Sequence, residues 1–110
     1  YTMTSDESEA VKLIQNAFFA VKVAFFNEAN ALCNARRMNW SRVLEALLAD
    51  GRIAHAHTEV PGPDGLFGFG GACLPKDLSC FIDCAKSHNL DALVAQAAAV
   101  RNIDDRNRRQ

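Results

Sequence analysis

A cysteine lies between a glycine-rich segment and a predicted helix start in residues 67–77, Phe-Gly-Phe-Gly-Gly-Ala-Cys-Leu-Pro-Lys-Asp. The three glycines let a ligand approach the backbone closely, and Pro75 suits the first turn of a helix, where its missing N–H is not needed. The unpaired N–H groups and the positive end of the helix dipole, together with Lys76, favour the thiolate form of Cys73. The segment therefore predicts a nucleophilic thiol with oxyanion donors beside it.

Two pairs of residues have the spacing of one helical turn. Asp77 follows Cys73 by four residues and can act as a base for a reaction at the thiol. Lys12 and Asn16 are also four apart, so both side chains project from one face of a helix, where they can hold an oxyanion or a water. The alternative for Lys12 and Asn16 is an ordinary solvated helix surface, which is the usual reading of a lysine near a polar residue. The alternative for Cys73, considered without its neighbours, is a buried structural cysteine.

Both groups of residues resemble motifs of one family. Residues 68–77 resemble the active-site motif Gly-Phe-Gly-Gly-x-Cys-x-Pro-Lys-Asp of the UDP-glucose/GDP-mannose dehydrogenase family. Residues 8–20 resemble the family helix that carries Lys-x-x-x-Asn, and the two motifs occur in the family's order. The resemblance extends from about Ser8 to Arg106, which is the family's central, dimer-forming domain. It implies an enzyme that oxidises the primary alcohol of a nucleotide sugar to a carboxylate in two NAD-dependent hydride transfers.

The resemblance implies a role for each residue of the two pairs. Cys73 would trap the intermediate aldehyde and then form a thioester. Asp77 would assist the water that releases the acid, while Lys12 and Asn16 would stabilise charge on oxygen and orient that water. The function class that follows is an oxidoreductase, with these four residues as its catalytic group.

Substrate contacts also follow from the resemblance. It places Phe69 and Gly70, with Lys76 nearby, against the bound nucleotide sugar, and it places Arg52 on the substrate of the neighbouring subunit. A guanidinium suits diphosphate or sugar oxygens, although a solvated arginine after a helix cap is nearly as good a reading of Arg52. The insertion at residues 60–65 resembles the UDP-glucose enzymes more than the GDP-mannose enzymes, which remain the alternative.

The chain is predicted to be a single domain over residues 1–110. It has no strand followed by Gly-x-Gly-x-x-Gly and a helix, so NAD would be bound by an N-terminal domain absent from this chain, as would be the C-terminal nucleotide-sugar-binding domain. Alone, the domain is expected to be inactive. Because it begins at Tyr1 rather than at a methionine, a piece of a longer enzyme is favoured over a stand-alone dimerisation or sugar-binding module, or a redox-sensing interaction module.

Composition excludes several kinds of partner. Twelve basic and thirteen acidic residues give a net charge of −1, which provides no field for nucleic acid or an anionic membrane. No apolar run is long enough to span a bilayer, and no signal peptide is apparent. A reactive thiol among four cysteines indicates a reducing compartment, so the cytoplasm is the expected location.

The predicted fold is all-α, with one long N-terminal helix, about three shorter helices and a long glycine-rich active-site loop. The long helix starts near Thr4 and spans Ser8 to Ala35, with apolar residues on several faces. One small core cannot bury them all, so this helix is predicted to form a homodimer. The predicted segments are Trp40 to Leu48 capped by Asn39, the loop Arg52 to Leu74, Pro75 to about His88, and about Leu90 to Arg106.

Two further predictions concern the last two helices. Leu93, Val94, Ala97 and either Val100 or Arg101 are expected on the inner face of the last one. Cys80, Cys84 and His88 recur every four residues, but one ion cannot reach ligands two turns apart, so no metal site is predicted. Both cysteines are instead expected in the core, and His55 and His57 are expected to make polar contacts in the loop.

Overall fold

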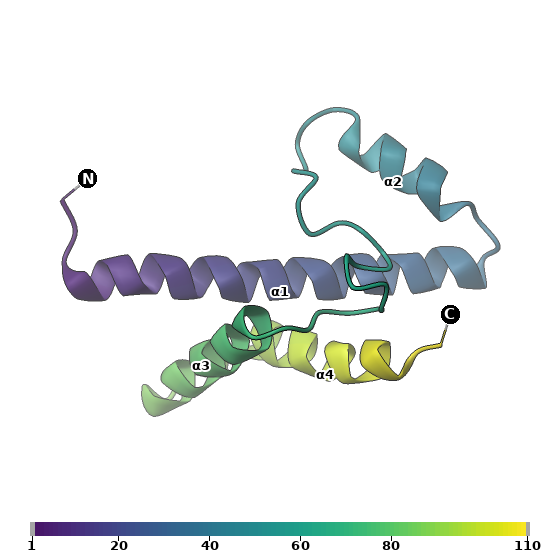
Figure 1. The fold of residues 1–110 in the computed structure, drawn as a ribbon. Helices are drawn as coiled ribbons and strands as arrows, with labels where there is room; N and C mark the ends of the chain where they lie inside the picture. Colours follow the sequence, from purple (N-terminus) through teal and green to yellow (C-terminus); the bar gives the residue numbers. More distant parts are fainter. Residues whose placement is uncertain (1, 110) are drawn as a thin grey trace.

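The computed structural model describes residues 2–109, and no strand occurs within them. Four helices follow one another along the chain: α1 Ser5–Ala35, α2 Trp40–Leu48, α3 Cys73–Ser87 and α4 Leu93–Asn107. The all-α prediction is therefore confirmed. Helix α1 runs the length of the molecule, with α3 and α4 on one side of it and α2 on the other (Figure 1). None of the described helices is long and apolar enough to cross a membrane.

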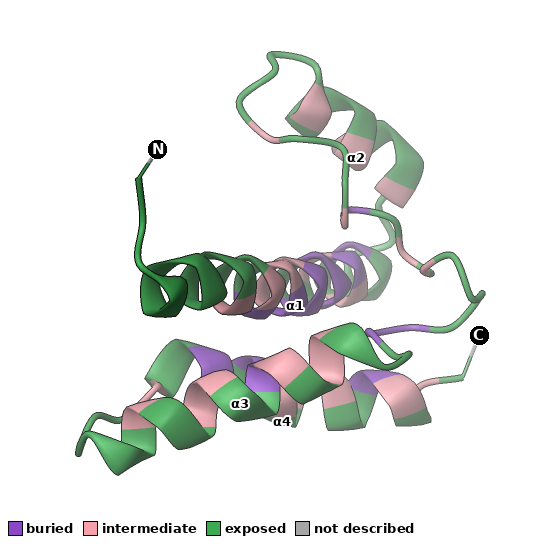
Figure 2. Cartoon of the chain, turned by 60° about the vertical axis from the view of Figure 1, so that its left-hand side comes forward, coloured by how far each residue is buried: buried purple, intermediate pink, exposed green. Residues whose placement is uncertain are grey.

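Helix α1 begins at Ser5, directly after Thr4, where a helix start was predicted, because Thr4 and Glu7 form a capping box. The Thr4 hydroxyl accepts from the Glu7 N–H at 3.1 Å, and the Glu7 carboxylate accepts from the Thr4 N–H at 2.9 Å. These bonds satisfy backbone donors that the first turn leaves open. The first two turns of α1 are exposed, and its buried residues lie from the middle of the helix onward (Figure 2).

Small side chains form the core between α1, α3 and α4. Alanines of α1 pack against Leu78 of α3 and against Ala95 and Ala98 of α4. Because alanine has only a methyl group, the helix backbones can approach closely. The predicted inner face of α4 is wrong for the same reason: the larger residues face outward, and those exposed are Leu93, Val94, Ala97 and Val100, while Arg101 is partly buried.

The prediction that Cys80 and Cys84 are core residues is also wrong. Both are exposed, and the side of α3 that faces α1 and α4 carries Leu78, Phe81 and Ile82 instead. Leu78 and Ile82 are one helical turn apart, as the buried stripe of a helix requires. The larger apolar side chains thus take the inner face and leave the thiols on the outer one.

Residues 49–72 connect α2 to α3 without helix or strand. Most of these residues are exposed, but Thr58, Phe67, Gly68 and Phe69 are buried. The segment therefore returns to α1 before α3 begins, where the Gly68 N–H donates to Asn27.

Candidate functional site

The two predicted residue pairs meet where α1 packs on α3. The Asn16 side-chain N–H donates to the Asp77 carboxylate at 2.6 Å, and both residues are half-buried. Lys12 lies one turn before Asn16 on α1, and Cys73 lies one turn before Asp77 on α3; both are exposed. Residues four apart share a helix face. The hydrogen bond between Asn16 and Asp77 therefore brings together the α1 face that carries Lys12 and the α3 face that carries Cys73.

Cys73 is the first residue of α3, which begins two residues before the predicted Pro75. Its N-cap, Ala72, makes no side-chain capping hydrogen bond. The first-turn N–H groups of α3 are therefore not occupied by a cap and remain available to an anionic group near the thiol. Pro75 lies in this first turn, as expected from its fixed backbone angle.

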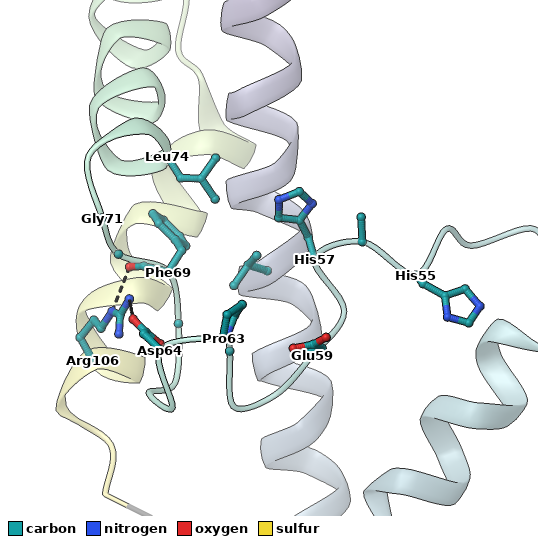
Figure 3. A pocket seen from close by; sticks show the side chains of 14 residues that line it. His55, His57, Glu59, Pro63, Asp64, Phe69, Gly71, Leu74 and Arg106 are labelled. Carbon is teal, nitrogen blue, oxygen red and sulfur yellow. Dashed lines mark hydrogen bonds and ion pairs between the residues drawn. The ribbon is translucent and has the colours of Figure 1, made fainter.

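A cavity of about 530 Å³ opens beside the glycine-rich segment. Residues 55–71 form much of its wall, and Val23 of α1, Leu74 of α3 and Arg106 of α4 complete it (Figure 3). Phe69 and Gly70 both line the cavity, so two of the predicted substrate contacts are located there. The volume is in the range of small-molecule sites.

An ion pair crosses one side of this cavity. The Arg106 guanidinium donates to the Asp64 carboxylate at 2.9 Å and to the Phe69 carbonyl at 2.9 Å (Figure 3). The Leu66 N–H, and then Arg106, hold the pKa of Asp64 below its usual value. Asp64 is thus an anion at neutral pH, and it orients Arg106 with one edge toward the glycine segment.

His57 forms another part of the wall, and its ring stacks on Phe19 of α1 with 4.3 Å between centroids. Burial, and then the charge of Lys22, lower the pKa of His57. Lys22 is held nearby by donating to the Ala54 carbonyl at 2.7 Å. The imidazole is therefore neutral at pH 7, and the expectation of simple polar loop contacts missed this aromatic stack.

We expect His57 to make the fold less stable in mild acid. Because its pKa in the folded chain lies below the ordinary value of 6.5, its contribution is complete above pH 6.5 and is lost as the pH falls toward the lower folded pKa. His57→Phe keeps a ring against Phe19 but cannot be protonated. Urea unfolding between about pH 7.5 and 5.5 should show a smaller loss of stability in this variant than in the unmodified chain.

The matched control for that experiment is His55→Phe, since His55 is exposed. It should retain the pH dependence of the unmodified chain. An equal loss of pH dependence in both variants, or none in His57→Phe, would contradict the assignment to His57.

Residues 6–105 match the model of the UDP-glucose/GDP-mannose dehydrogenase family, central domain. The chain belongs to this family. UDP-glucose 6-dehydrogenase of Campylobacter jejuni is 38% identical over 77 residues, which are 70% of this chain and 18% of that protein. The Rhizobium meliloti enzyme of the same name is 33% identical over 105 residues, 96% of this chain and 23% of that protein.

The relative from Haloferax volcanii, UDP-glucose 6-dehydrogenase AglM, is 34% identical over 92 residues, 84% of this chain and 20% of that protein. The chain thus spans about a fifth of the length of these relatives. No solved structure gives a significant match.

Two predicted substrate contacts of this dehydrogenase domain lie outside the cavity. The Arg52 side chain is 87% exposed and pairs with Asp50 at 2.8 Å. Lys76 is exposed on α3 and is not part of the cavity wall. Within residues 2–109, no cluster of three or more His, Cys, Asp and Glu could hold a metal ion.

Sequence reasoning missed the polar residues that hold the glycine segment of this dehydrogenase domain: Asn27 of α1, and Asn102 and Arg106 of α4. A signal was present for Asn27, because it interrupts a stretch of α1 whose buried residues, apart from Asn30, are apolar. A buried amide requires a hydrogen-bond partner, and the nearest segment with free backbone groups is the loop.

Proposed function

We propose that this chain is the central domain of a UDP-glucose 6-dehydrogenase, whose NAD-binding and C-terminal nucleotide-sugar-binding domains lie outside residues 1–110. The observation that carries the proposal is the hydrogen bond of 2.6 Å between Asn16 and Asp77. It joins the Lys-x-x-x-Asn pair on α1 to the Cys-x-x-x-Asp pair on α3. Neither pair could act on the other's reaction centre without this packing.

Cys73 captures the aldehyde made from the primary alcohol of the sugar. Its thiolate adds to the carbonyl carbon, a C–S bond forms, and the carbonyl oxygen takes the negative charge and then a proton. Lys12 and the first-turn N–H groups of α3 stabilise that charge. Loss of that proton from the oxygen and of a hydride from the same carbon then gives a thioester on Cys73.

Asp77 acts as the base in the hydrolysis that releases the acid. A water held near its carboxylate attacks the thioester carbon and gives up a proton to that carboxylate, the C–S bond breaks, and the Cys73 thiolate leaves. Asn16, which donates to Asp77, fixes the orientation of the carboxylate. The carbon that entered as an alcohol leaves as the carboxylate of a uronic acid.

NAD, when bound, accepts one hydride at each of the two oxidations. The described residues contain no strand and hence no strand–glycine loop–helix unit of the kind that binds dinucleotides. The residues of this chain therefore contribute the thiol and the water chemistry, and the redox cofactor belongs to another domain.

The nucleotide sugar fits beside the glycine segment. The cavity of about 530 Å³ is lined by Phe69 and Gly70, and α3 starts within four residues of them. Arg106 and the backbone N–H groups provide donors for phosphate or sugar oxygens. Lys76, in the first turn of α3, adds a positive charge on the same side as Cys73. Arg52, paired only with a residue of its own turn, is free to reach a neighbouring subunit.

The test uses the protein encoded by the complete reading frame that contains residues 1–110. With UDP-glucose and NAD, we expect two NADH per UDP-glucuronic acid formed, measured by absorbance and chromatography. GDP-mannose in place of UDP-glucose is the control, and preferential turnover of it would favour the GDP-mannose-type enzyme. Absence of NADH with either sugar would favour the stand-alone module without catalysis.

We also propose a homodimer through α1. The exposed apolar residues of this helix form one stripe at heptad spacing, and its large members are Val11, Ile14, Phe18, Phe25 and Leu32. The stripe is opposite the face that carries Lys12, Asn16 and Asn27. Such a long exposed apolar stripe is unusual on a monomer. A second copy can cover it without approaching the thiol.

A groove beside the stripe supports the same partner. It measures about 350 Å³ and lies between α1 and α4, where Phe25 faces Leu93 and Val94. These are the large α4 residues that the core leaves outside. Both helices therefore offer apolar surface to one partner, and the second copy brings an identical surface to it.

All four cysteines are free thiols, which is compatible with the reducing cytoplasm as the place of the reaction.

A further inference from the structure

Asn102 of α4 pairs with both backbone groups of a single loop residue. Its side-chain oxygen accepts from the Phe69 N–H at 2.7 Å, and its side-chain N–H donates to the Phe69 carbonyl at 2.9 Å. The Asn102 side chain thus takes the place of a neighbouring β-strand, which would pair with the same backbone N–H and carbonyl. Phe69 itself is buried, so these backbone groups would be costly to leave unpaired.

Two further side chains hold the same point of the loop. Asn27 of α1 is 1% exposed, and its side-chain oxygen accepts from the Gly68 N–H at 2.9 Å. Arg106, one turn after Asn102 on α4, donates to the Phe69 carbonyl at 2.9 Å. Residues from two helices thus bind two consecutive loop residues, which line the cavity together with Gly70 and Gly71.

The glycines on either side of Phe69 are required by these contacts. A Cβ on Gly68 would collide with the Asn102 side-chain oxygen and would lie 3.0 Å from the Asp105 Cβ, and the Gly68 φ of 80° also disfavours a side chain. A Cβ on Gly70 would collide with the Arg106 guanidinium. The two glycines therefore allow close approach of protein side chains of α4, in addition to any ligand.

We propose that Asn102 is a positioning residue, which fixes the backbone of Phe69 and thereby the place where Cys73 starts α3. Only three residues separate Phe69 from Cys73. So short a tether spans at most about 14 Å between the two Cα atoms, and displacement of Phe69 must move the α3 start. The consequence for catalysis rests on the proposed function, whereas the positioning itself does not.

The experiment compares Asn102→Ala with Asn107→Ala in the 110-residue chain. Asn107 is an exposed amide of the same helix, and its side chain donates only to the Ile103 carbonyl of its own helix. Hydrogen exchange followed by NMR should show the Phe69 amide exchanging about tenfold faster or more in Asn102→Ala, the effect of losing one buried hydrogen bond. Asn107→Ala should leave that rate unchanged.

A second readout follows the thiols by mass spectrometry after iodoacetamide. Cys73 and Cys80 are both exposed on α3, so their labelling ratio reports the state of the helix start. In Asn102→Ala this ratio should fall by roughly threefold or more, because a displaced start no longer directs its N–H groups at Cys73. Buried Cys33 measures global opening and should label no faster than in the unmodified chain.

The outcomes separate positioning from general stability. Unchanged exchange at Phe69, or an unchanged or higher Cys73-to-Cys80 ratio, would overturn the proposal.

If Cys33 is labelled rapidly in Asn102→Ala, the chain has unfolded. The test is then made with Asn102→Asp, which keeps the acceptor for the Phe69 N–H. That variant should protect the Phe69 amide within about threefold of the unmodified chain, and loss of protection would again overturn the proposal. Neither readout needs NAD or UDP-glucose, so an inactive enzyme would refute the proposed function alone.

Discussion

Replacing Cys73 with serine should lower the rate of uronic acid formation by roughly a thousandfold or more, with UDP-glucose binding retained. A serine hydroxyl is scarcely ionised at neutral pH, whereas a thiolate both attacks an aldehyde and leaves readily from a thioester. Because Cys73 is exposed at the start of α3, the substitution removes no core contact. The aldehyde should accumulate, and product analysis by mass spectrometry of the complete enzyme measures both effects.

Cys80→Ser is the matched control for this experiment. Cys80 is an exposed cysteine of the same helix, two turns further along, and neither Cys73 nor Cys80 is part of the cavity wall. It should leave turnover within about twofold of the unmodified enzyme, the range of ordinary surface substitutions. Full turnover by Cys73→Ser would refute the covalent mechanism. An equal loss in both variants would show that the effect lies in α3 rather than in the thiol.

The elements of this fold could be predicted from local signals. Asn39 accepts a hydrogen bond from the Arg42 N–H and starts α2 where its residue type predicted a cap. The family motifs likewise predicted which helix faces carry Lys12 and Asn16, since spacing alone determines a shared face. The catalytic roles remain predictions, because spacing does not establish a reaction.

Packing partners were not predictable in the same way. Helix α4 has two faces with apolar residues, and either could face the core. The face with the larger residues was predicted to be buried, but the structure buries the other one. The structure buries Ala95 and Ala98 because α1 offers alanines at the crossing, and close helix approach excludes leucine there. Which face is inward depends on residues about 70 positions earlier in the chain, a relation that no local pattern contains.

The contact of Asn102 with Phe69 was hidden for a related reason. Asn102 is a half-buried amide in a helix, and its partner is a backbone that the sequence describes only as glycine-rich. Glycines at 68 and 70 indicated close approach, but ligand and protein side chains require the same absence of a Cβ. Only the folded arrangement distinguishes the two.

Replacing Phe25 with aspartate should dissociate the proposed dimer and leave the monomer folded. Phe25 is 61% exposed in the single chain, so the fold does not depend on burying it. Between two copies its ring would be enclosed by the groove of α1 and α4, and an aspartate there would be an unpaired buried charge. An unpaired buried charge costs about 3 kcal/mol or more. Because each step of about 1.4 kcal/mol changes a dissociation constant tenfold, the dissociation constant should rise by roughly a hundredfold or more.

Sedimentation equilibrium measures this effect as a mass of twice the 12.0 kDa chain for the unmodified protein and of one chain for Phe25→Asp. Circular dichroism should show the same helix content in both. Leu66→Asp is the control, because Leu66 is also an exposed apolar residue, 54% accessible, but lies in the loop away from the stripe. It should remain a dimer. If the unmodified chain is monomeric at all concentrations, the stripe on α1 is covered by another partner, and the heptad spacing from Val11 to Leu32 does not indicate self-association.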